Sequence, residues 1–355
     1  DTAYEYVASV PATTNYHEDV NISSEDWYRY KLKAFNSNGY SDISDPDSGY
    51  VDLTGPLYFR GIIKRDSGDN QYGRMAMKSE LLLATDGRYL RVFDVSIPSS
   101  PEEVDSYQHP TEVIRDVSVA NDYNDQVIIV TDNKFVSLNI DEYGNAQVNS
   151  SISISGQCLS VAAMEGTAFV GTSSDGLQAI DIMSPWSLYW MSNYNGITGF
   201  NDVKIYNPGN LYVMGATEND GFVIVDATDT YNMTYVNGYS LPSAAKGIYL
   251  NSQKAYLANT SSGLQVVDYN DLWTLSFYGS TTDFTDARGV WVYGNSAMIA
   301  AGTDGVIVVD KSSFASVDAY ATESACVDII YDSINSFMYA SVPGIGIYVF
   351  DYPSP

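Results

Sequence analysis

The sequence GLQVVD at residues 263–268 is one copy of the motif that decides the fold. The motif consists of a glycine, four mostly apolar residues and an aspartate, and a turn rich in Ser, Thr, Asp and Gly precedes it. Five copies are clear: GLQAID at 176–181, GFVIVD at 221–226, GLQVVD at 263–268, GVIVVD at 305–310 and GIYVFD at 346–351. Two weaker copies precede them, YLRVFD at 89–94 and KFVSLN at 134–139. The last residues of successive copies are 41 to 45 residues apart, and this near-constant period indicates seven structural repeats.

Each repeat contains four candidate strands, as the sixth repeat illustrates. Residues 289–293 and 297–301 are apolar runs joined by a Gly294-Asn295 turn, and residues 306–309 form a third such run. Near-continuous apolar strands of this kind are typical of sheets covered on both faces. A more polar fourth strand follows at 313–320, and no stretch keeps the 3.6-residue period of a helix. Four strands repeated about every 42 residues predict the blades of an all-β, seven-bladed β-propeller.

The two ends of the repeat region support the count of seven blades. The seventh repeat has candidate strands near 327–331, 337–340 and 345–352, but the sequence ends before a fourth strand. Residues 57–63, LYFRGII, precede the first repeat and belong to no complete unit. We therefore predict that this segment pairs with the seventh blade and closes the ring, because closure removes two exposed sheet edges.

Composition excludes several classes of partner. Lys plus Arg number 17 and Asp plus Glu number 44, which gives a formal charge of 17 − 44 = −27. A nucleic-acid partner is not expected, because such proteins neutralise phosphates with clustered positive charge. The hydrophobic content of 45% excludes wholesale disorder. No apolar run approaches the length of about 18 residues that a membrane span requires.

The motif copies resemble a known repeat family. The GLxVVD-type cores, with Ile97-Pro98 and Pro101 after the first copy, resemble LVIVD repeats over about residues 57–355. That family is predicted to form propellers in secreted and surface proteins of bacteria and archaea. The resemblance implies a propeller and an extracellular or cell-surface location, but it carries no catalytic residues.

Residues 1–56 contain no copy of the motif and are predicted to form a separate domain. The sequence WYRYKLKAFNSNGYSDISDPDS at 27–48 resembles the last two strands of a fibronectin type III domain. A complete domain of that family needs about 90 residues, so only its C-terminal part is expected here. Either the sequence was cut from a longer protein or strands of another chain complete the sandwich, and we favour truncation.

The aspartate that ends each motif copy has two interpretations. Seven equivalent carboxylates could form a ring of acids, but we favour turn formation, in which each accepts a backbone N–H bond. Asn139 could make the same bond in the second repeat. Acidic stretches at 42–47, 66–70, 121–125 and 218–220 have oxygen ligands that suit Ca²⁺. None has the spacing of an EF-hand loop, and a solvated acidic surface is the alternative; no other metal or cofactor is expected.

Basic residues recur where the innermost strands begin. Alignment of the repeats places Arg115, Lys246 and Arg288 at equivalent positions, with Arg74 close to one and Asn201 at another. Innermost strands line the channel of a propeller, so these side chains are predicted to surround one channel mouth. They could bind an anionic or carboxylate-bearing ligand, since guanidinium groups donate forked hydrogen bonds. The alternative, which we favour, is local ion pairing with nearby carboxylates of Asp116, Asp202 and Asp286.

No recognisable catalytic set is present, although this does not exclude catalysis. The sequence has no G-x-S-x-G, no H-E-x-x-H and no phosphate-binding loop. Cys158 and Cys326 are at matching positions of the third and seventh repeats, on opposite sides of the ring. We therefore predict that both cysteines are unpaired, because a disulfide requires a Cα separation below about 7 Å.

Three hypotheses for function follow. We favour a non-enzymatic secreted or cell-surface scaffold for assembly, adhesion or interaction, such as a surface-layer or filament subunit with protein partners or self-association. The alternative is a ligand- or glycan-binding module that uses the channel mouth or exposed tyrosines of the outer strands, since tyrosine stacks well on sugars. The third hypothesis is a propeller hydrolase or lyase.

Overall fold

The computed structural model describes residues 57–352 except 65–69, 99, 121–124 and 165. Of the first 56 residues it describes four strands, β1 (Trp27–Tyr30), β2 (Phe35–Asn36), β3 (Gly39–Tyr40) and β4 (Asp47–Tyr50). β1 pairs with β4 and β2 pairs with β3, both antiparallel. The chain divides into two compact units, Asp1–Pro56 and Leu57–Pro355. Most residues that carry the fibronectin type III resemblance lie outside the described residues, so that resemblance stays a prediction.

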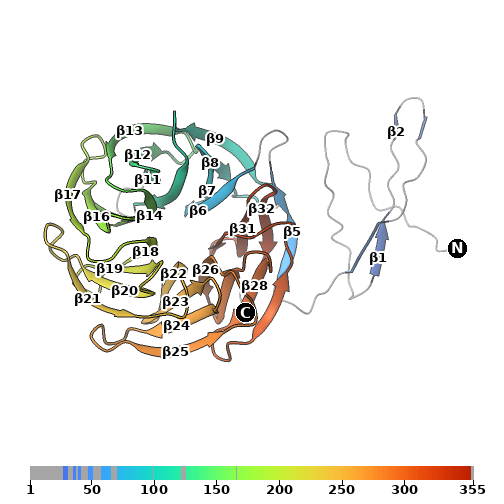
Figure 1. The fold of residues 1–355 in the computed structure, drawn as a ribbon. Helices are drawn as coiled ribbons and strands as arrows, with labels where there is room; N and C mark the ends of the chain where they lie inside the picture. The colour runs from blue at the N-terminus through green and yellow to red at the C-terminus, as the bar shows by residue number, and fades with distance from the viewer. Residues whose placement is uncertain are drawn as a thin grey trace. The chain divides into compact units, whose positions relative to one another are not determined.

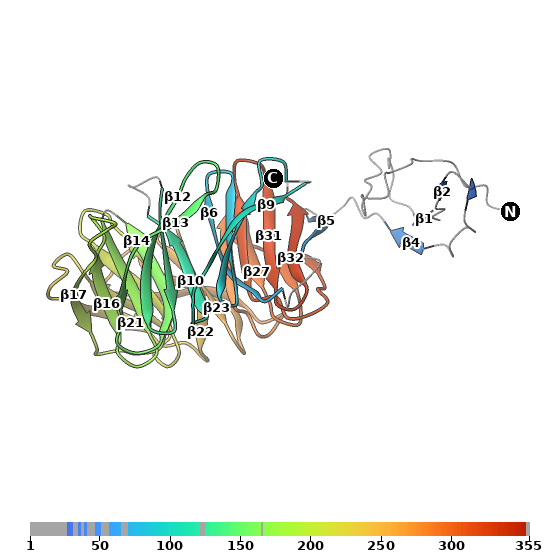
Figure 2. The same ribbon diagram turned by 90° about the horizontal axis from the view of Figure 1, so that it is seen from above.

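The larger unit contains seven four-stranded antiparallel sheets arranged in a ring, with the first strand of each sheet innermost (Figures 1 and 2). Blade 1 consists of β6 (Tyr72–Lys78), β7 (Leu81–Asp86), β8 (Tyr89–Asp94) and β9 (Glu102–Gln108). Blade 2 consists of β10 (Ile114–Val119), β11 (Gln126–Thr131), β12 (Lys134–Ile140) and β13 (Ala146–Ser153). Blade 3 consists of β14 (Cys158–Met164), β15 (Thr167–Thr172), β16 (Leu177–Asp181) and β17 (Tyr189–Tyr194).

The remaining blades follow the same order from the channel outward. Blade 4 consists of β18 (Phe200–Tyr206), β19 (Tyr212–Thr217), β20 (Phe222–Asp226) and β21 (Thr234–Tyr239). Blade 5 consists of β22 (Ala245–Asn251), β23 (Lys254–Asn259), β24 (Gly263–Asp268) and β25 (Ser276–Thr281). Blade 6 consists of β26 (Gly289–Tyr293), β27 (Ser296–Ala300), β28 (Val306–Asp310) and β29 (Ser316–Tyr320). Blade 7 consists of β30 (Asp328–Asp332), β31 (Phe337–Val342), β32 (Gly346–Asp351) and β5 (Tyr58–Ile63).

The ring closes as the sequence predicts. β5 pairs antiparallel with β32, and the strand order of the last sheet is β30-β31-β32-β5. Figure 1 shows this junction, where the blue strand β5 lies along the red sheet. The Phe59 ring stacks on Tyr320 of blade 6 at a centroid distance of 5.0 Å, and the Leu57 amide donates to Asp318 at 2.9 Å. The first segment of the propeller therefore binds both of its last two blades.

The hydrophobic core is divided among the junctions between blades. Seven clusters of buried apolar side chains are present in the described residues, and each combines side chains of two neighbouring blades. The two middle strands of each blade are almost wholly buried, as in β19 and β20. This explains why the motif reads as a continuous apolar run, because both faces of each sheet pack on a neighbour.

The aspartate that ends the motif forms a turn in five blades. Its Oδ1 accepts the backbone N–H two residues later, at 2.8–3.0 Å, at Asp94, Asp181, Asp226, Asp268 and Asp310. In blade 7 Asp351 pairs with Arg60 of β5 at 2.8 Å. In blade 2 the corresponding bond comes from Asp141, whose Oδ1 accepts the N–H of Tyr143 at 3.0 Å. The turn-forming interpretation of the repeated aspartates is thus confirmed in these five blades.

Candidate functional site

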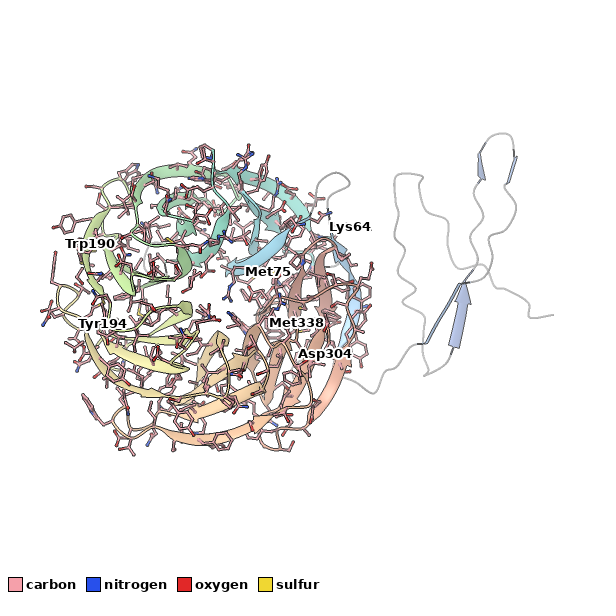
Figure 3. The ribbon with its side chains drawn as sticks, viewed as in Figure 1. Lys64, Met75, Trp190, Tyr194, Asp304 and Met338 are labelled. Carbon is pink, nitrogen blue, oxygen red and sulfur yellow. The ribbon has the colours of Figure 1, made fainter. Side chains whose placement is uncertain are left out.

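The five predicted mouth residues lie where the innermost strands begin. Arg115, Asn201 and Lys246 each occupy a β-bulge at the start of an inner strand, and Arg74 occupies the corresponding bulge of β6. Arg288 immediately precedes β26, and its amide donates to Ala300 O at 2.8 Å. A bulge turns one side chain out of the regular alternation of a strand. Figure 3 shows Met75, the residue after Arg74, beside the central opening.

Three of the mouth cations pair with carboxylates on the same side of the ring. Arg115 donates two hydrogen bonds to Asp132 Oδ1, at 2.8 and 2.6 Å, and Arg288 contacts Asp286 at 2.7 Å. Lys246 pairs with Glu218, which also accepts a 2.9 Å bond from Asn201. Hydrogen bonds from Lys246 and then Asn201 hold the pKa of Glu218 below its usual value. These positive charges are therefore already compensated within the protein.

The local pairing predicted from the sequence is present, with two different partners. Arg288 pairs with Asp286 as expected, whereas Arg115 pairs with Asp132. Asp132 follows β11 and Glu218 follows β19, so both lie in the turn between the second and third strands of a blade. Asp132 pairs with a cation of its own blade, whereas Glu218 of blade 4 pairs with Lys246 of blade 5. Alignment of the inner strands alone reveals neither proximity.

Arg74 reaches across the channel. Its Nη2 donates to the carbonyl oxygens of Asn201 and Lys246, at 3.0 and 3.1 Å, in blades 4 and 5. Its Nη1 lies 3.7 Å from Asp328 Oδ1 and 3.9 Å from Asp202 Oδ2. The side chain is 21% exposed. A single guanidinium thus connects blade 1 to the opposite side of the ring.

Three buried aspartates surround Arg74 and join neighbouring blades. Asp116 accepts the amide of Val161 at 2.8 Å, Asp202 that of Ile248 at 3.0 Å, and Asp328 that of Met75 at 2.8 Å. Each bond runs from one inner strand to the inner strand of the next blade. From the sequence, Asp116 and Asp202 were expected only as local ion-pair partners, and this role between blades was not predicted. The sequence did contain a signal for this role. In the repeat alignment each of the three aspartates stands directly after the residue at the start of its inner strand, namely Arg115, Asn201 or Val327.

The electrostatics of this cluster follow from its burial. Loss of solvation raises the pKa of Asp116 to about 6, against the opposing effect of the nearby Arg74 charge. Burial likewise raises the pKa of Asp328. Burial acts against the charge of Arg74, but Asp202, Asp328 and Asp116 together raise its pKa, so the guanidinium stays protonated. The arrangement is a buried charge network that fastens the ring.

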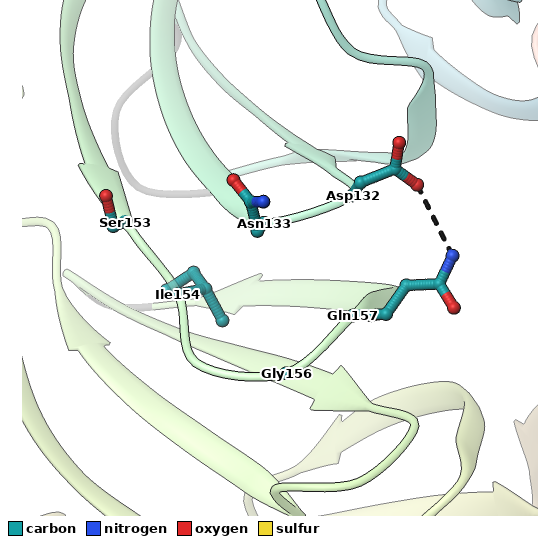
Figure 4. Close-up of a pocket in the computed structure, with 6 residues that line it drawn as sticks. All are labelled: Asp132, Asn133, Ser153, Ile154, Gly156 and Gln157. Atoms are coloured by element: carbon teal, nitrogen blue, oxygen red, sulfur yellow. Dashed lines mark hydrogen bonds between the residues drawn. The ribbon is translucent and has the colours of Figure 1, made fainter.

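An open hollow of about 630 Å³ lies beside the Arg115–Asp132 pair, between blades 2 and 3. Its lining is mostly polar, with side chains of Asp132, Asn133, Ser153 and Gln157 (Figure 4). Gln157 Nε2 donates to Asp132 Oδ1 at 3.3 Å. The described residues contain no group of three or more His, Cys, Asp or Glu side chains arranged to hold a metal ion. Of the acidic stretches considered for Ca²⁺, only 218–220 is described in full.

The two cysteines are free and buried, as predicted. Burial raises the pKa of the Cys158 thiol to about 12, so the reactive thiolate is scarce at neutral pH. Burial also raises the pKa of Cys326. Neither thiol is therefore suited to act as a nucleophile.

No helix long and apolar enough to cross a membrane is present in the described part of the chain.

A second surface lies at the opposite end of the strands. Four consecutive blades each carry a highly exposed aromatic side chain in the turn between their third and fourth strands: Tyr143, Trp186, Tyr231 and Trp273, which are 63–74% exposed. We call these four residues the aromatic arc. These turns lie beside the turns between first and second strands, as the 2.7 Å bond from Ile182 N to Gly166 O shows. The arc is therefore on the face opposite the Arg and Lys mouth.

Each turn of the aromatic arc holds its ring in the same way. The aromatic residue is the third of four, and the amide of the fourth residue donates to the carbonyl of the first, at 2.9–3.1 Å. In the turns of Tyr143, Tyr231 and Trp273 the first residue is an aspartate that also accepts the aromatic residue's own amide. Such a turn fixes the backbone from which the side chain projects.

The preceding blade supports three of the four turns. Ser150 Oγ donates to Pro185 O at 2.6 Å, and Ser192 Oγ donates to Thr230 O at 2.6 Å. Asn237 Nδ2 donates to Leu272 O at 3.3 Å. These acceptors immediately precede Trp186, Tyr231 and Trp273. Further exposed aromatic side chains lie on the adjoining outer strands, among them Trp190 (Figure 3), Tyr235 and Phe277. The outer-strand tyrosines were expected from the sequence, whereas the aromatic side chains of these turns were not.

Comparison with known proteins defines the architectural class. Residues 83–109 and 285–322 match the LVIVD repeat model, and these segments lie mainly in blades 1 and 6. These matches show LVIVD repeats in those two segments, and the unit of residues 57–355 is a seven-bladed β-propeller, as predicted. No curated protein sequence matches it.

Solved structures confirm the propeller fold. The crystal structure of the Cps50 (Swd1) β-propeller domain of Myceliophteria thermophila superposes with a TM-score of 0.65 at 11% sequence identity, covering 83% of this chain and 99% of that one. The crystal structure of Saccharomyces cerevisiae Sqt1 gives a TM-score of 0.62 at 11% identity, covering 84% of this chain and 87% of that one. At this level of identity the likeness concerns the fold alone.

Proposed function

We propose that this chain is a non-enzymatic interaction scaffold of the cell surface or extracellular space, which adheres to its partner through the aromatic arc. The arc is the observation that carries the proposal. Exposed aromatic side chains bury a large apolar area on contact with a partner, and they lose little conformational freedom because they have few rotatable bonds. They are therefore effective anchors for binding. The turns and the neighbouring blades hold these side chains in place before a partner arrives, which reduces the entropic cost of binding.

The channel mouth supports the same proposal, because its basic side chains already bind groups of the protein itself. Arg115, Lys246 and Arg288 are paired with carboxylates, and Arg74 spans the channel. The extracellular location is supported by the resemblance to LVIVD repeats. We further propose that residues 1–56 form a fibronectin type III-like domain, separate from the propeller of residues 57–355, and that such chains assemble into a surface layer or filament.

The test is binding of the full chain to isolated cell envelopes of the source organism. We expect saturable retention by the envelopes without turnover of bound material. Replacement of Tyr143, Trp186, Tyr231 and Trp273 together by alanine is expected to remove retention. The matched control is Ile334→Ala in blade 7, which removes an equally exposed apolar side chain. Failure of the wild-type chain to bind, or equal binding by the fourfold variant, would contradict the proposal.

A second candidate is a small-ligand site at the mouth, favoured by the polar hollow beside Arg115. A carboxylate ligand could replace Asp132 on the Arg115 guanidinium and form the same forked hydrogen bonds. Screening of acidic sugars by calorimetry should then show binding that Arg115→Ala removes and that the aromatic-arc variant retains. Absence of any heat change across the screen would exclude this candidate for those sugars.

A further inference from the structure

We propose that the aromatic arc binds a neutral polysaccharide, whose sugar rings stack on Tyr143, Trp186, Tyr231 and Trp273. This inference rests on the proposed function, in which the arc is the adhesive surface, and it names the chemical class of the partner. Three properties of the surface carry the inference: its repetition, its charge and the chemistry between its aromatic side chains.

Repetition favours a polymer of repeated units. The arc presents one flat side chain per blade on four consecutive blades, each from the third position of an equivalent hydrogen-bonded turn. A partner with one recurring chemical group can satisfy all four positions in the same way. The arc ends at blade 5. In blade 6 the corresponding turn carries Phe314, which packs against the hydrophobic cluster and against Tyr278, at a centroid distance of 6.1 Å, and so is not presented to a partner.

Charge excludes anionic polymers from the arc. The turns and outer strands of blades 2–5, residues 139–153, 181–194, 226–239 and 268–281, contain no Lys or Arg. They do contain carboxylates, among them Asp141, Asp229 and Asp271. A nucleic acid or an anionic polysaccharide requires cations to neutralise its charge, and these segments contain none. The neighbouring Lys254 is already paired with Asp268 at 3.0 Å. A neutral chain meets no such electrostatic penalty.

The residues between the aromatic side chains suit hydroxyl groups. Several exposed side chains near the rings carry hydroxyl or amide groups, including Ser184, Ser187, Asn232 and Thr274, alongside exposed apolar side chains such as Met183. These groups both donate and accept, as a sugar hydroxyl requires of its partners. A protein interface would instead concentrate its anchors in one contiguous patch surrounded by less important contacts. In the arc each aromatic side chain belongs to a separate turn, and each has at least one polar residue directly beside it in the sequence.

The experiment compares envelope binding by the full chain after two treatments of the envelopes. Periodate followed by borohydride destroys vicinal diols of glycans, whereas a protease removes exposed protein. We expect periodate to abolish retention, whether or not the protease also reduces it. Retention that resists periodate but disappears with protease would overturn the inference and leave the scaffold proposal intact. No retention on untreated envelopes would contradict both.

Variants then assign the binding to the arc. Trp186→Ala and Trp273→Ala are each expected to weaken retention about threefold to tenfold, in line with the worth of one aromatic contact. Trp273→Phe and Tyr231→Phe keep a ring and are expected to retain most of the affinity. Affinity electrophoresis in gels containing xylan, mannan or hydroxyethyl cellulose provides soluble neutral probes, with alginate as the anionic control. Retardation by alginate alone, or alanine variants that bind like wild type, would overturn the inference.

Discussion

At the scale of single residues, the position at the start of the inner strand has different roles in different blades. The mouth position holds Arg115, Lys246 and Arg288 in surface ion pairs, whereas Arg74 at the same register enters the channel. Charges withdrawn from water lose solvation and become costly if their partners are removed. Exposed ion pairs contribute little by comparison. The four cations should therefore differ sharply in their effect on stability.

Arg74→Ala is predicted to destabilise the propeller by about 3–5 kcal/mol, because it leaves buried carboxylates without their counter-charge. The matched control is Arg115→Ala, which breaks the Asp132 pair at a half-exposed site and should cost less than about 1 kcal/mol. Urea unfolding followed by circular dichroism measures both free energies. Equal losses for the two variants would contradict the assigned role of Arg74.

The buried aspartates predict a dependence of stability on pH. The pKa of Asp116 is about 6 in the folded chain, whereas an aspartate in an unfolded chain titrates near about 4. Because the folded state binds this proton first as the pH falls, protonation of Asp116 between these values favours folding. Arg74, Asp202 and Lys204 are the charged groups that act on Asp116, and burial acts more strongly than any of them.

Asp116→Asn removes this titration and isolates its contribution. The unfolding free energy of the wild type, measured relative to this variant, should rise by on the order of 2 kcal/mol from about pH 7.5 to about pH 4.5. Other titrating groups are shared by both proteins and cancel in the difference. Parallel pH profiles of the two proteins would show that Asp116 does not titrate in this range.

At the scale of elements, the glycine that begins the motif explains the start of the third strand. Gly176 has a φ of +73°, and a Cβ at this position would overlap the carbonyl oxygen of Tyr194 on the outer strand. Gly221, Gly263 and Gly305 show the same combination in blades 4, 5 and 6. The glycine is therefore required both by backbone conformation and by the closeness of the fourth strand.

Gly176→Ala is predicted to destabilise blade 3 by about 2–4 kcal/mol, since it combines an unfavourable φ with a steric clash. Gly87→Ala serves as the control, because Gly87 also has a positive φ of +59° but an added Cβ would meet nothing within 4 Å. It should cost only about 1–2 kcal/mol. Thermal unfolding of both variants, followed by calorimetry, checks the difference. If the two losses are equal, the contact with the outer strand is not important.

Local pattern and period predicted most of the fold. The alternation of apolar runs with Gly- and Asp-rich turns defined the strands of blade 6, since such signals depend on neighbouring residues alone. The spare segment at 57–63 predicted closure because a free sheet edge is unfavourable. Placement of the five mouth residues at the starts of the inner strands followed from the repeat alignment. Whether they bind a ligand stays a prediction.

Features that depend on distances across the ring were not predictable. The contact of Arg74 with Asn201 and Lys246 joins residues more than 100 positions apart, and nothing in the local sequence indicates how far a side chain reaches across a channel. The aromatic arc was missed for a different reason. Its side chains stand in turns of unequal sequence, and their exposure becomes visible only when the neighbouring blade is in place.

At the scale of the whole molecule, stability depends on closure of the ring. Each hydrophobic cluster lies between two blades, so an open ring would expose one of the seven junctions. The Phe59 ring on β5 contacts Tyr320, Tyr348 and Phe350 at centroid distances of 5.0, 5.6 and 5.7 Å. This aromatic group fastens the closing strand to blades 6 and 7.

Phe59→Ala is predicted to weaken the closing strand, because it removes the aromatic contacts with blades 6 and 7. The loss of unfolding free energy should be only about 1–3 kcal/mol, since Phe59 is partly exposed. Hydrogen exchange should show faster exchange of β5 and β32 amides in this variant. Val317→Ala on the adjacent strand β29, where Val317 is 50% exposed, is the control. Unchanged exchange at β32 would contradict the role assigned to Phe59.

Hydroxyl-radical footprinting of the full chain on its cell envelope tests the central claim most directly, because it reports which face of the ring becomes covered. We predict protection of Tyr143, Trp186, Tyr231 and Trp273, with little change at Ile334 on blade 7. On the opposite face, we predict little change at Val113, which is 37% exposed and lies two residues before Arg115. Protection confined to the channel mouth, or an aromatic arc that stays as reactive as in the free protein, would contradict the account.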